Sequence, residues 1–145
     1  METMEELYGY SYDEIDVGMT DVFSKTVTEA DIMAYAGVSG DTNPVHLNEE
    51  FAAQTMFKTR IAHGMLSSGF ISAVFGTKLP GPGCIYIAQN LKFKAPVKVG
   101  DTVVARVTAL EKDDAKKMIK FETVCTVGDT AVITGDATIM IPDRG

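Results

Sequence analysis

GMLSSGFISAVFGTKL, residues 64–79, carries apolar side chains at helical spacing and places small residues between them. Its first charged side chain is Lys78. A helix that is apolar or small around its whole circumference is typically buried, because none of its faces suits water. The stretch therefore predicts a core helix that the rest of the chain encloses.

After PGPG at residues 80–83, the apolar pattern changes from helical spacing to alternation, which is typical of β-strands. Asp113-Asp114 and Gly128-Asp129 supply turns, so an antiparallel meander is expected. One buried helix and one curved antiparallel sheet predict an α+β fold in which the sheet wraps around the helix. The segments that read as long strands are residues 84–93, 102–111, 118–127 and 131–141.

The chain before the core helix predicts one more strand and two short helices. Residues 19–27 alternate in polarity and read as the first strand. Thr28 is a favourable N-cap for a helix that Gly37 and Gly40 would end. Asn43-Pro44 places proline at the first position of a second short helix.

The whole chain, residues 1–145, is expected to form a single domain, because its length is ordinary for one domain and no linker interrupts it. Residues 1–15 are expected to be a loosely ordered acidic lead-in, although Tyr8, Tyr10 and Tyr12 resemble a packing strap. The chain starts without the basic and apolar regions of a signal peptide, and no apolar stretch is long enough to span a bilayer. A cytoplasmic protein with no membrane partner is therefore expected.

Charge and cysteine content argue against two classes of partner. The net charge of −7 disfavours nucleic acid, which needs clustered Lys and Arg. Cys84 and Cys125 lie far apart in strand-like segments, and two histidines without a cysteine cluster do not form a zinc pattern. We therefore expect no nucleic-acid partner and no metal.

Asp41 and His46 are the candidate catalytic pair. They lie five residues apart across a turn that contains Pro44, so a carboxylate and an imidazole can converge on one water molecule. Adding water to an activated double bond requires a base for the water and an acid for the carbon α to the carbonyl, and such a pair supplies both. The alternative is that Asp41 merely caps the turn and His46 is a surface residue.

Gly64 is the candidate for binding a carbonyl group. It begins the core helix, where N–H groups are unpaired and the helix dipole is positive, and it has no side chain to keep a ligand away. Such a donor would stabilise the enolate-like charge that forms when hydroxide adds to the β carbon of an unsaturated thioester. The alternative is that Gly64 only relieves crowding, and the adjacent His63 is interpreted as a structural or hydrogen-bonding residue.

Three blocks of the sequence resemble the MaoC-like hydratase family. SGDTNPVHLNEEFA at residues 39–52 closely resembles its hydratase 2 motif. HGML at residues 63–66 and KAPVKVGD at residues 94–101 are similar to the family in order and spacing. The resemblance covers about residues 18–142, and within the family the chain looks like the R-specific enoyl-CoA hydratases.

This resemblance implies a hot-dog fold and homodimers whose sheets join edge to edge. It implies that Asp41 and His46 are the catalytic dyad, that Asn43 orients them, and that the Gly64 N–H binds the thioester carbonyl of a trans-2-enoyl-CoA. The product would be the (R)-3-hydroxyacyl-CoA, formed reversibly. No metal or redox cofactor is implied, because CoA enters as part of the substrate. The setting would be fatty acid or polyhydroxyalkanoate metabolism.

The family pattern leaves three points open. Met65, Ser72 and Phe75 of the core helix are candidates for lining the acyl pocket, although an aromatic residue on an apolar helix is also typical of core packing. Val45 and Asn48-Glu49 stand where many members have leucine and Asp-Pro. CoA phosphates need cationic partners, and the sequence does not choose among the nearest basic residues, which are Arg60, Lys78, Lys92, Lys94 and Lys98.

Two other functions compete with hydration. A hot-dog thioesterase would direct water at the carbonyl carbon, but residues 64–77 contain no carboxylate of the kind that such enzymes carry on or near the central helix. A non-catalytic acyl-CoA-binding dimer would have no need to keep Asp41, Asn43, His46 and Gly64 together. A nicotinamide or flavin oxidoreductase is not supported, because no strand leads into a GxGxxG motif.

Overall fold

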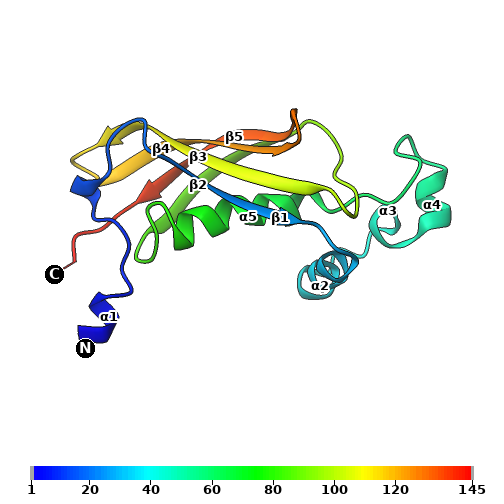
Figure 1. The fold of residues 1–145 in the computed structure, drawn as a ribbon, viewed down its shortest axis with the longest axis horizontal. Helices are drawn as coiled ribbons and strands as arrows, with labels where there is room; N and C mark the ends of the chain where they lie inside the picture. The colour runs from blue at the N-terminus through cyan, green and yellow to red at the C-terminus, as the bar shows by residue number, and fades with distance from the viewer. Residues whose placement is uncertain (1, 145) are drawn as a thin grey trace.

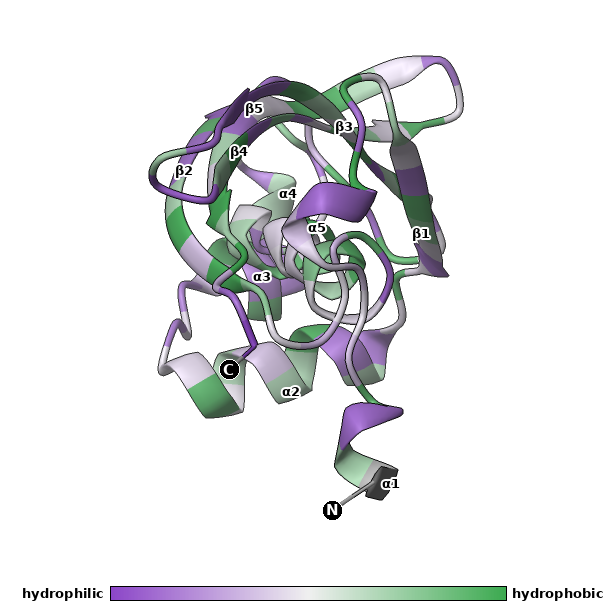
Figure 2. Ribbon diagram, turned by 90° about the vertical axis from the view of Figure 1, so that its left-hand side faces the viewer, coloured by the Kyte–Doolittle hydropathy of each residue, from purple (hydrophilic) through white to green (hydrophobic). Residues whose placement is uncertain are grey.

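A five-stranded antiparallel sheet curves around one long helix (Figure 1). The computed structural model describes residues 2–144. The helix α5 (Gly64–Thr77) lies on the concave side of the sheet, as the view along the helix in Figure 2 shows. This arrangement is the hot-dog fold that the family resemblance implies. In the order in which they pair, the strands are β1 (Thr20–Thr26), β3 (Thr102–Asp113), β4 (Met118–Val127), β5 (Thr130–Met140) and β2 (Ile85–Phe93).

The predicted core helix and all five predicted strands are confirmed, and their ends differ from the expected ones by a few residues at most. Strand β3 shows why the alternation was informative, because its inward side chains are buried while most of those between them are not. The first and last strands of the sheet, β1 and β2, each pair on one side only. β2 pairs antiparallel with β5 and leaves its other edge free.

The inner face of α5 forms the centre of the core. Phe70, Ile71, Val74 and Phe75 are buried there, facing the inward residues of the sheet. Burying one such side chain contributes about 1.5–3 kcal/mol relative to leaving it exposed. This packing fixes the position of α5 and therefore the position of its first turn. The inward residues of the sheet are Val103, Ala105, Val107, Ala109, Ile119, Phe121, Cys125, Ile133, Ala137 and Ile139.

The opposite face of α5 is uncovered within the single chain. Met65 is 53 % exposed, and Gly69, Ser72 and Gly76 are exposed as well. Their spacing of three and four residues places them in one stripe along the helix. The prediction that the helix is enclosed on every side is therefore wrong for one copy of the chain. The sheet curls around one side only, and the small residues leave the other side open.

The segment before β1 is better ordered than expected. It contains α1 (Glu2–Glu5) and a short 3-10 turn at Tyr12–Glu14. Tyr12 and Ile15 are buried, and burial together with the Asp114 carboxylate raises the pKa of the Tyr12 hydroxyl to about 12. Lys112 Nζ donates to the carbonyls of both residues, at 3.0 and 2.7 Å. The prediction of a loosely ordered lead-in is thus wrong for this part, because Tyr12 and Ile15 complete the core.

Three helices connect β1 to α5 and lie together at one end of the molecule (Figure 1): α2 (Glu29–Ser39), α3 (Pro44–Leu47) and α4 (Glu49–Ala53). We call residues 28–53 the α2–α4 segment. The predicted caps are confirmed, since Thr28 accepts from the Asp31 N–H and Asn43 caps α3. Gly40, with φ of 81°, ends α2 as expected, whereas α2 continues through Gly37. No helix within residues 2–144 is long and apolar enough to cross a membrane.

Candidate active site

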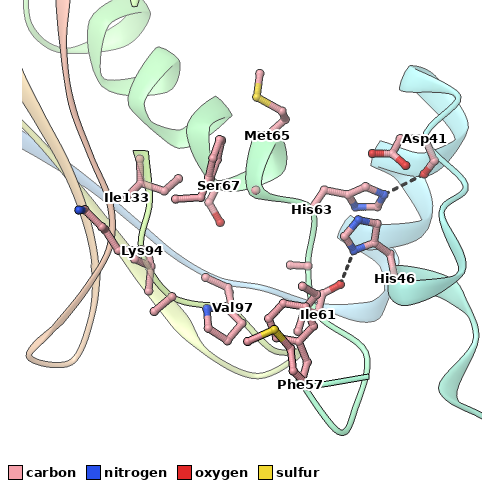
Figure 3. A pocket seen from close by; sticks show the side chains of 17 residues that line it. Asp41, His46, Phe57, Ile61, His63, Met65, Ser67, Lys94, Val97 and Ile133 are labelled. Carbon is pink, nitrogen blue, oxygen red and sulfur yellow. Dashed lines mark hydrogen bonds between the residues drawn. The ribbon is translucent and has the colours of Figure 1, made fainter. Parts of the chain in front are cut away.

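A cavity of about 410 Å³ lies where the α2–α4 segment meets the first turn of α5 (Figure 3). The predicted catalytic pair, Asp41 and His46, and the predicted carbonyl-binding residue Gly64 all line it. His63 lines it too, beside His46. The larger apolar side chains in the lining are those of Met56, Phe57, Ile61, Met65, Phe93, Val97, Val132 and Ile133. The polar side chains of the cavity thus cluster near the start of α5, and most of the other lining residues are apolar.

His46 is held in one tautomer by the backbone. It lies on α3, is 8 % exposed, and its Nδ1 is 2.7 Å from the carbonyl oxygen of Ile61. A carbonyl only accepts, so Nδ1 carries the proton and Nε2 keeps its lone pair. This lone pair is the kind of acceptor that a general base needs.

Asp41 and Asn43 are joined through the turn that precedes α3. The backbone N–H of Asn43 donates to Asp41 Oδ1 at 3.2 Å, and the side-chain oxygen of Asn43 accepts from the Val45 N–H at 3.1 Å. Asn43 therefore touches the Asp41 carboxylate with its backbone and caps the helix that carries His46 with its side chain. This geometry fits the expected orienting role, although Asn43 does not line the cavity.

His63 is the second imidazole of the site, and its contacts agree with its interpretation as a hydrogen-bonding residue. It is 1 % exposed, and its Nε2 donates to the carbonyl oxygen of Asp41 at 2.9 Å. Its ring stacks on that of His46, with centroids 3.9 Å apart and planes at 31°. The ring of Tyr35 lies 4.7 Å away on another side. His63 thus supports both predicted members of the dyad, one through a hydrogen bond and the other through stacking.

Asp41, His46 and His63 each offer one potential metal ligand, and these three atoms lie within 4.8 Å of one another. The stacked arrangement of the two imidazoles opposes a metal site, however. With ring centroids 3.9 Å apart, the two imidazoles lie mainly face to face, whereas tetrahedral coordination requires the lone pairs of the ligands to converge on one point. The same short distances suit a water molecule, which can donate to two of the three acceptors.

Gly64 occupies the first position of α5, so its N–H is the first of the unpaired donors at that helix end. A Cβ at this position would lie 2.5 Å from Cε1 of Phe93. The alternative that Gly64 relieves crowding therefore holds, because the Phe93 ring occupies the space of a side chain. Its role as a donor to a ligand is compatible with this. The N–H bond is on the backbone nitrogen, whereas a side chain would project from Cα in another direction.

Of the three residues predicted for the acyl pocket, one lies at the cavity. Met65 lines the cavity, whereas Ser72 and Phe75 do not. Phe75 packs in the core, with its ring 5.0 Å from that of Phe121, and Ser72 lies on the open stripe of α5. The reason is distance along the helix, because each residue adds about 1.5 Å and both positions lie two to three turns beyond Gly64.

Sequence reasoning missed Ser67 and Phe93 as cavity residues. Ser67 is 1 % exposed, and its Oγ has no hydrogen-bond partner among the described residues. Its position three residues after Gly64 was a usable signal, because side chains at that spacing share a helix face. Phe93 approaches Gly64 from β2, and nothing in the local sequence indicates this contact.

The basic residues near the site differ in whether their charged groups already have partners within the chain. Lys94 lines the cavity. Arg60 is paired with Glu29 and Glu49, and Lys78 Nζ donates to the carbonyl of Val22 at 2.7 Å. Of these three cations, Lys94 is the one placed to meet an anionic ligand in the cavity.

Known proteins share both the sequence and the fold. The family model described as MaoC like domain matches residues 14–131. The chain belongs to this MaoC-like family. An (R)-specific enoyl-CoA hydratase from Rhodospirillum rubrum is 55% identical to the MaoC-like chain over 141 residues, which are 97% of this chain and 98% of the relative. A 3-hydroxybutyryl-CoA dehydratase from Methylorubrum extorquens is 42% identical over 141 residues, which are 97% of this chain and 90% of that relative.

Solved structures of MaoC-like proteins superpose closely. The R-hydratase from Pseudomonas aeruginosa in the unliganded form gives a TM-score of 0.88 at 42% identity and covers 95% of this chain and 89% of its own. The (R)-hydratase from A. caviae involved in PHA biosynthesis gives a TM-score of 0.85 at 39% identity and covers 88% of this chain and 98% of its own. The family and the fold that the sequence blocks implied are confirmed.

The two imidazoles of the MaoC-like chain are expected to hold opposite neutral tautomers, with the proton on Nδ1 in His46 and on Nε2 in His63. Long-range proton–nitrogen NMR of protein with labelled histidine, recorded under alkaline conditions, reports both tautomers directly. The chain has two histidines, so His63→Gln leaves the signals of His46 alone and assigns the spectrum. Finding the same tautomer in both rings would contradict this geometry.

Proposed function

We propose that this chain reversibly hydrates a trans-2-enoyl-CoA to the (R)-3-hydroxyacyl-CoA, as a hydro-lyase. The observation that carries the proposal is the grouping of the Asp41 carboxylate and the free Nε2 of His46 at the start of α5, on one apolar cavity. The name of the R. rubrum relative, (R)-specific enoyl-CoA hydratase, supports it at 55% identity.

Asp41 and His46 would hold the water between them. The His46 Nε2 lone pair takes one proton as the water oxygen attacks the β carbon, and the Asp41 carboxylate accepts a hydrogen bond from the hydrogen that stays on that oxygen. The electron pair of the double bond moves toward the carbonyl, and the dyad returns a proton to the α carbon. The β carbon thus gains the hydroxyl group and the α carbon gains the proton, so the step is balanced. Positioned acid–base groups of this kind typically contribute about 10²–10⁴-fold in rate.

The Gly64 N–H would stabilise the charge that moves onto the thioester oxygen. It lies at the positive end of α5, a helix of 14 residues, where backbone dipoles favour developing negative charge. The reaction shifts only protons and one electron pair, so it requires neither metal nor redox cofactor. CoA would enter as part of the substrate, with Lys94 at the cavity available to its phosphates.

The active form would be a homodimer joined at the β2 edges. β2 has an unpaired edge, and its side chains are unusually exposed for apolar residues, with Ile85 45 %, Ile87 47 % and Phe93 53 % accessible. Unprotected apolar strand edges are places where another strand adds. The open stripe of α5 adds a second surface that a partner can cover. We further propose a cytoplasmic role in fatty acid or polyhydroxyalkanoate metabolism, supported by the A. caviae structure described as involved in PHA biosynthesis.

Loss of either dyad member should remove hydration and leave the fold intact. With crotonyl-CoA as substrate, we expect Asp41→Asn and His46→Gln each to lower kcat by about 10²–10⁴-fold. The measurement is the decay of the enoyl-thioester ultraviolet band, followed together with a free-thiol assay. Asp129→Asn, in an exposed turn, serves as the control and should keep full activity. Release of free thiol by the wild-type protein would replace hydration with thioester hydrolysis as its function.

The Gly64 donor can be tested by removing its hydrogen without changing the helix start. His63 has φ of −60° and ψ of 133°, which suits a residue before proline, and proline is tolerated at the first helical position. In a Phe93→Ala background, which clears space for a ring, Gly64→Pro should lower kcat about 10²–10³-fold relative to Gly64→Ala. Equal rates for the two double variants would rule out the Gly64 N–H as the carbonyl donor.

The dimer proposal predicts that a charge on the free edge separates the subunits. Ile87→Lys should shift the sedimentation mass from twice that of the chain to that of a single chain at low protein concentration. Val38→Lys, on the outer surface of α2 where Val38 is 85 % exposed, should leave the dimer intact. A wild-type protein that sediments as a monomer throughout would overturn this arrangement.

A further inference from the structure

Arg60 connects three separate parts of the chain through one guanidinium group. Its Nη1 and Nη2 donate to the two carboxylate oxygens of Glu29, at 2.8 and 2.6 Å, and its Nε lies 3.5 Å from Glu49 Oε2. Nη1 also reaches the backbone carbonyl of His46 at 3.4 Å. Glu29 begins α2, His46 lies on α3 and Glu49 begins α4. The three helices of the α2–α4 segment therefore share one cation.

The surroundings of Arg60 are arranged to hold this geometry. Thr59 Oγ1 donates to Glu49 Oε1 at 2.6 Å, and the Arg60 backbone N–H donates to Glu49 Oε2 at 3.3 Å. The hydrogen bonds from Arg60 keep the pKa of the Glu29 carboxyl below its usual value, so this acid is charged at neutral pH. Two of the three ion pairs within residues 2–144 belong to Arg60, and the third joins Lys25 to Asp31.

The two shorter helices that Arg60 contacts, α3 and α4, bury few side chains. α3 and α4 contain four and five residues, too few to be stable alone. Each buries one side chain, which is His46 in α3 and Ala52 in α4. Besides the packing of Leu47 against the core, the position of His46 depends on its hydrogen bond to Ile61, its ring contact with His63 and the contact of its carbonyl with Arg60.

We propose that Arg60 is a positioning residue for His46, which it holds by clamping α2, α3 and α4 to one another. The proposal rests on the hydration function proposed above, because it explains how the general base keeps its place. It also gives a role to Glu49, which departs from the family pattern within the motif, since this residue supplies one carboxylate of the clamp.

The competing role for Arg60, binding of a CoA phosphate, is disfavoured by charge. One guanidinium between two carboxylates leaves the cluster with a net negative charge, which repels phosphate. Its Nε and both terminal nitrogens already have acceptors within the chain. A loss of the clamp should therefore appear in kcat, whereas a loss of CoA binding would appear in KM.

The test compares Arg60→Met with Lys25→Met, which removes the remaining ion pair of α2 without touching α3. With crotonyl-CoA, Arg60→Met should lower kcat about tenfold to hundredfold, as expected for a small misplacement of a catalytic group, with KM changed by less than about threefold. Lys25→Met should keep the wild-type kcat. Glu29→Gln, which breaks the bidentate pair from the other side, should lower kcat in the same direction. If Arg60→Met does not fold, Glu29→Gln carries the test.

A second readout does not depend on activity. The proton on His46 Nδ1, which donates to Ile61, should exchange faster with water in Arg60→Met and at the wild-type rate in Lys25→Met. Unchanged kcat and unchanged exchange in Arg60→Met would overturn the clamp, and so would a rise in KM alone or an equal loss in Lys25→Met. If the wild-type chain does not hydrate crotonyl-CoA, the proposed function fails, while the exchange comparison still decides on Arg60.

Discussion

The geometry of the site depends on the short backbone segment from Arg60 to Gly64. Its carbonyl at Ile61 fixes the tautomer of His46, its His63 ring holds the Asp41 carbonyl, and its last residue starts α5. The Ala62 N–H donates to the Val97 carbonyl at 2.7 Å, which ties the same segment to the chain that leads into β3. The carboxylate of Asp41, the imidazole of His46 and the N–H of Gly64 are thus all positioned by this one backbone segment. The core packing of α5 fixes where that segment ends. The packing of the fold therefore also fixes the position of the site.

Local sequence was sufficient to predict the features that depend on interactions between neighbouring residues. Alternating side chains predicted the strands, and Thr28, Asn43 and Gly40 marked helix ends because capping and left-handed turns need those residue types. Asp41 and His46 could be paired because the turn at Pro44 brings residues of one loop together. Their placement beside Gly64 was inferred from chemistry and family resemblance, and the cavity lining brings all three together.

The features that escaped prediction come from contacts between distant parts of the chain. The burial of Tyr12 depends on Lys112 and Asp114, about a hundred residues away, and the Phe93 ring reaches Gly64 from the end of another strand. The open stripe of α5 was misjudged because composition shows that a helix avoids water but not which neighbour covers it. Ser72 and Phe75 lie away from the cavity for a related reason, since helical phase and distance along the helix both decide what a side chain reaches.

The contact between Phe93 and Gly64 ties the carbonyl-binding end of α5 to the free edge of the sheet. Phe93 is the last residue of β2, the strand proposed to meet its counterpart in a second copy. In the proposed dimer, a displacement of β2 would move this ring against the helix start, because no side chain at Gly64 separates them. The state of this sheet edge would then matter for turnover, because β2 supplies the ring that lies beside the carbonyl-binding end of α5. Quaternary structure and turnover would then be mechanically coupled through a single aromatic ring.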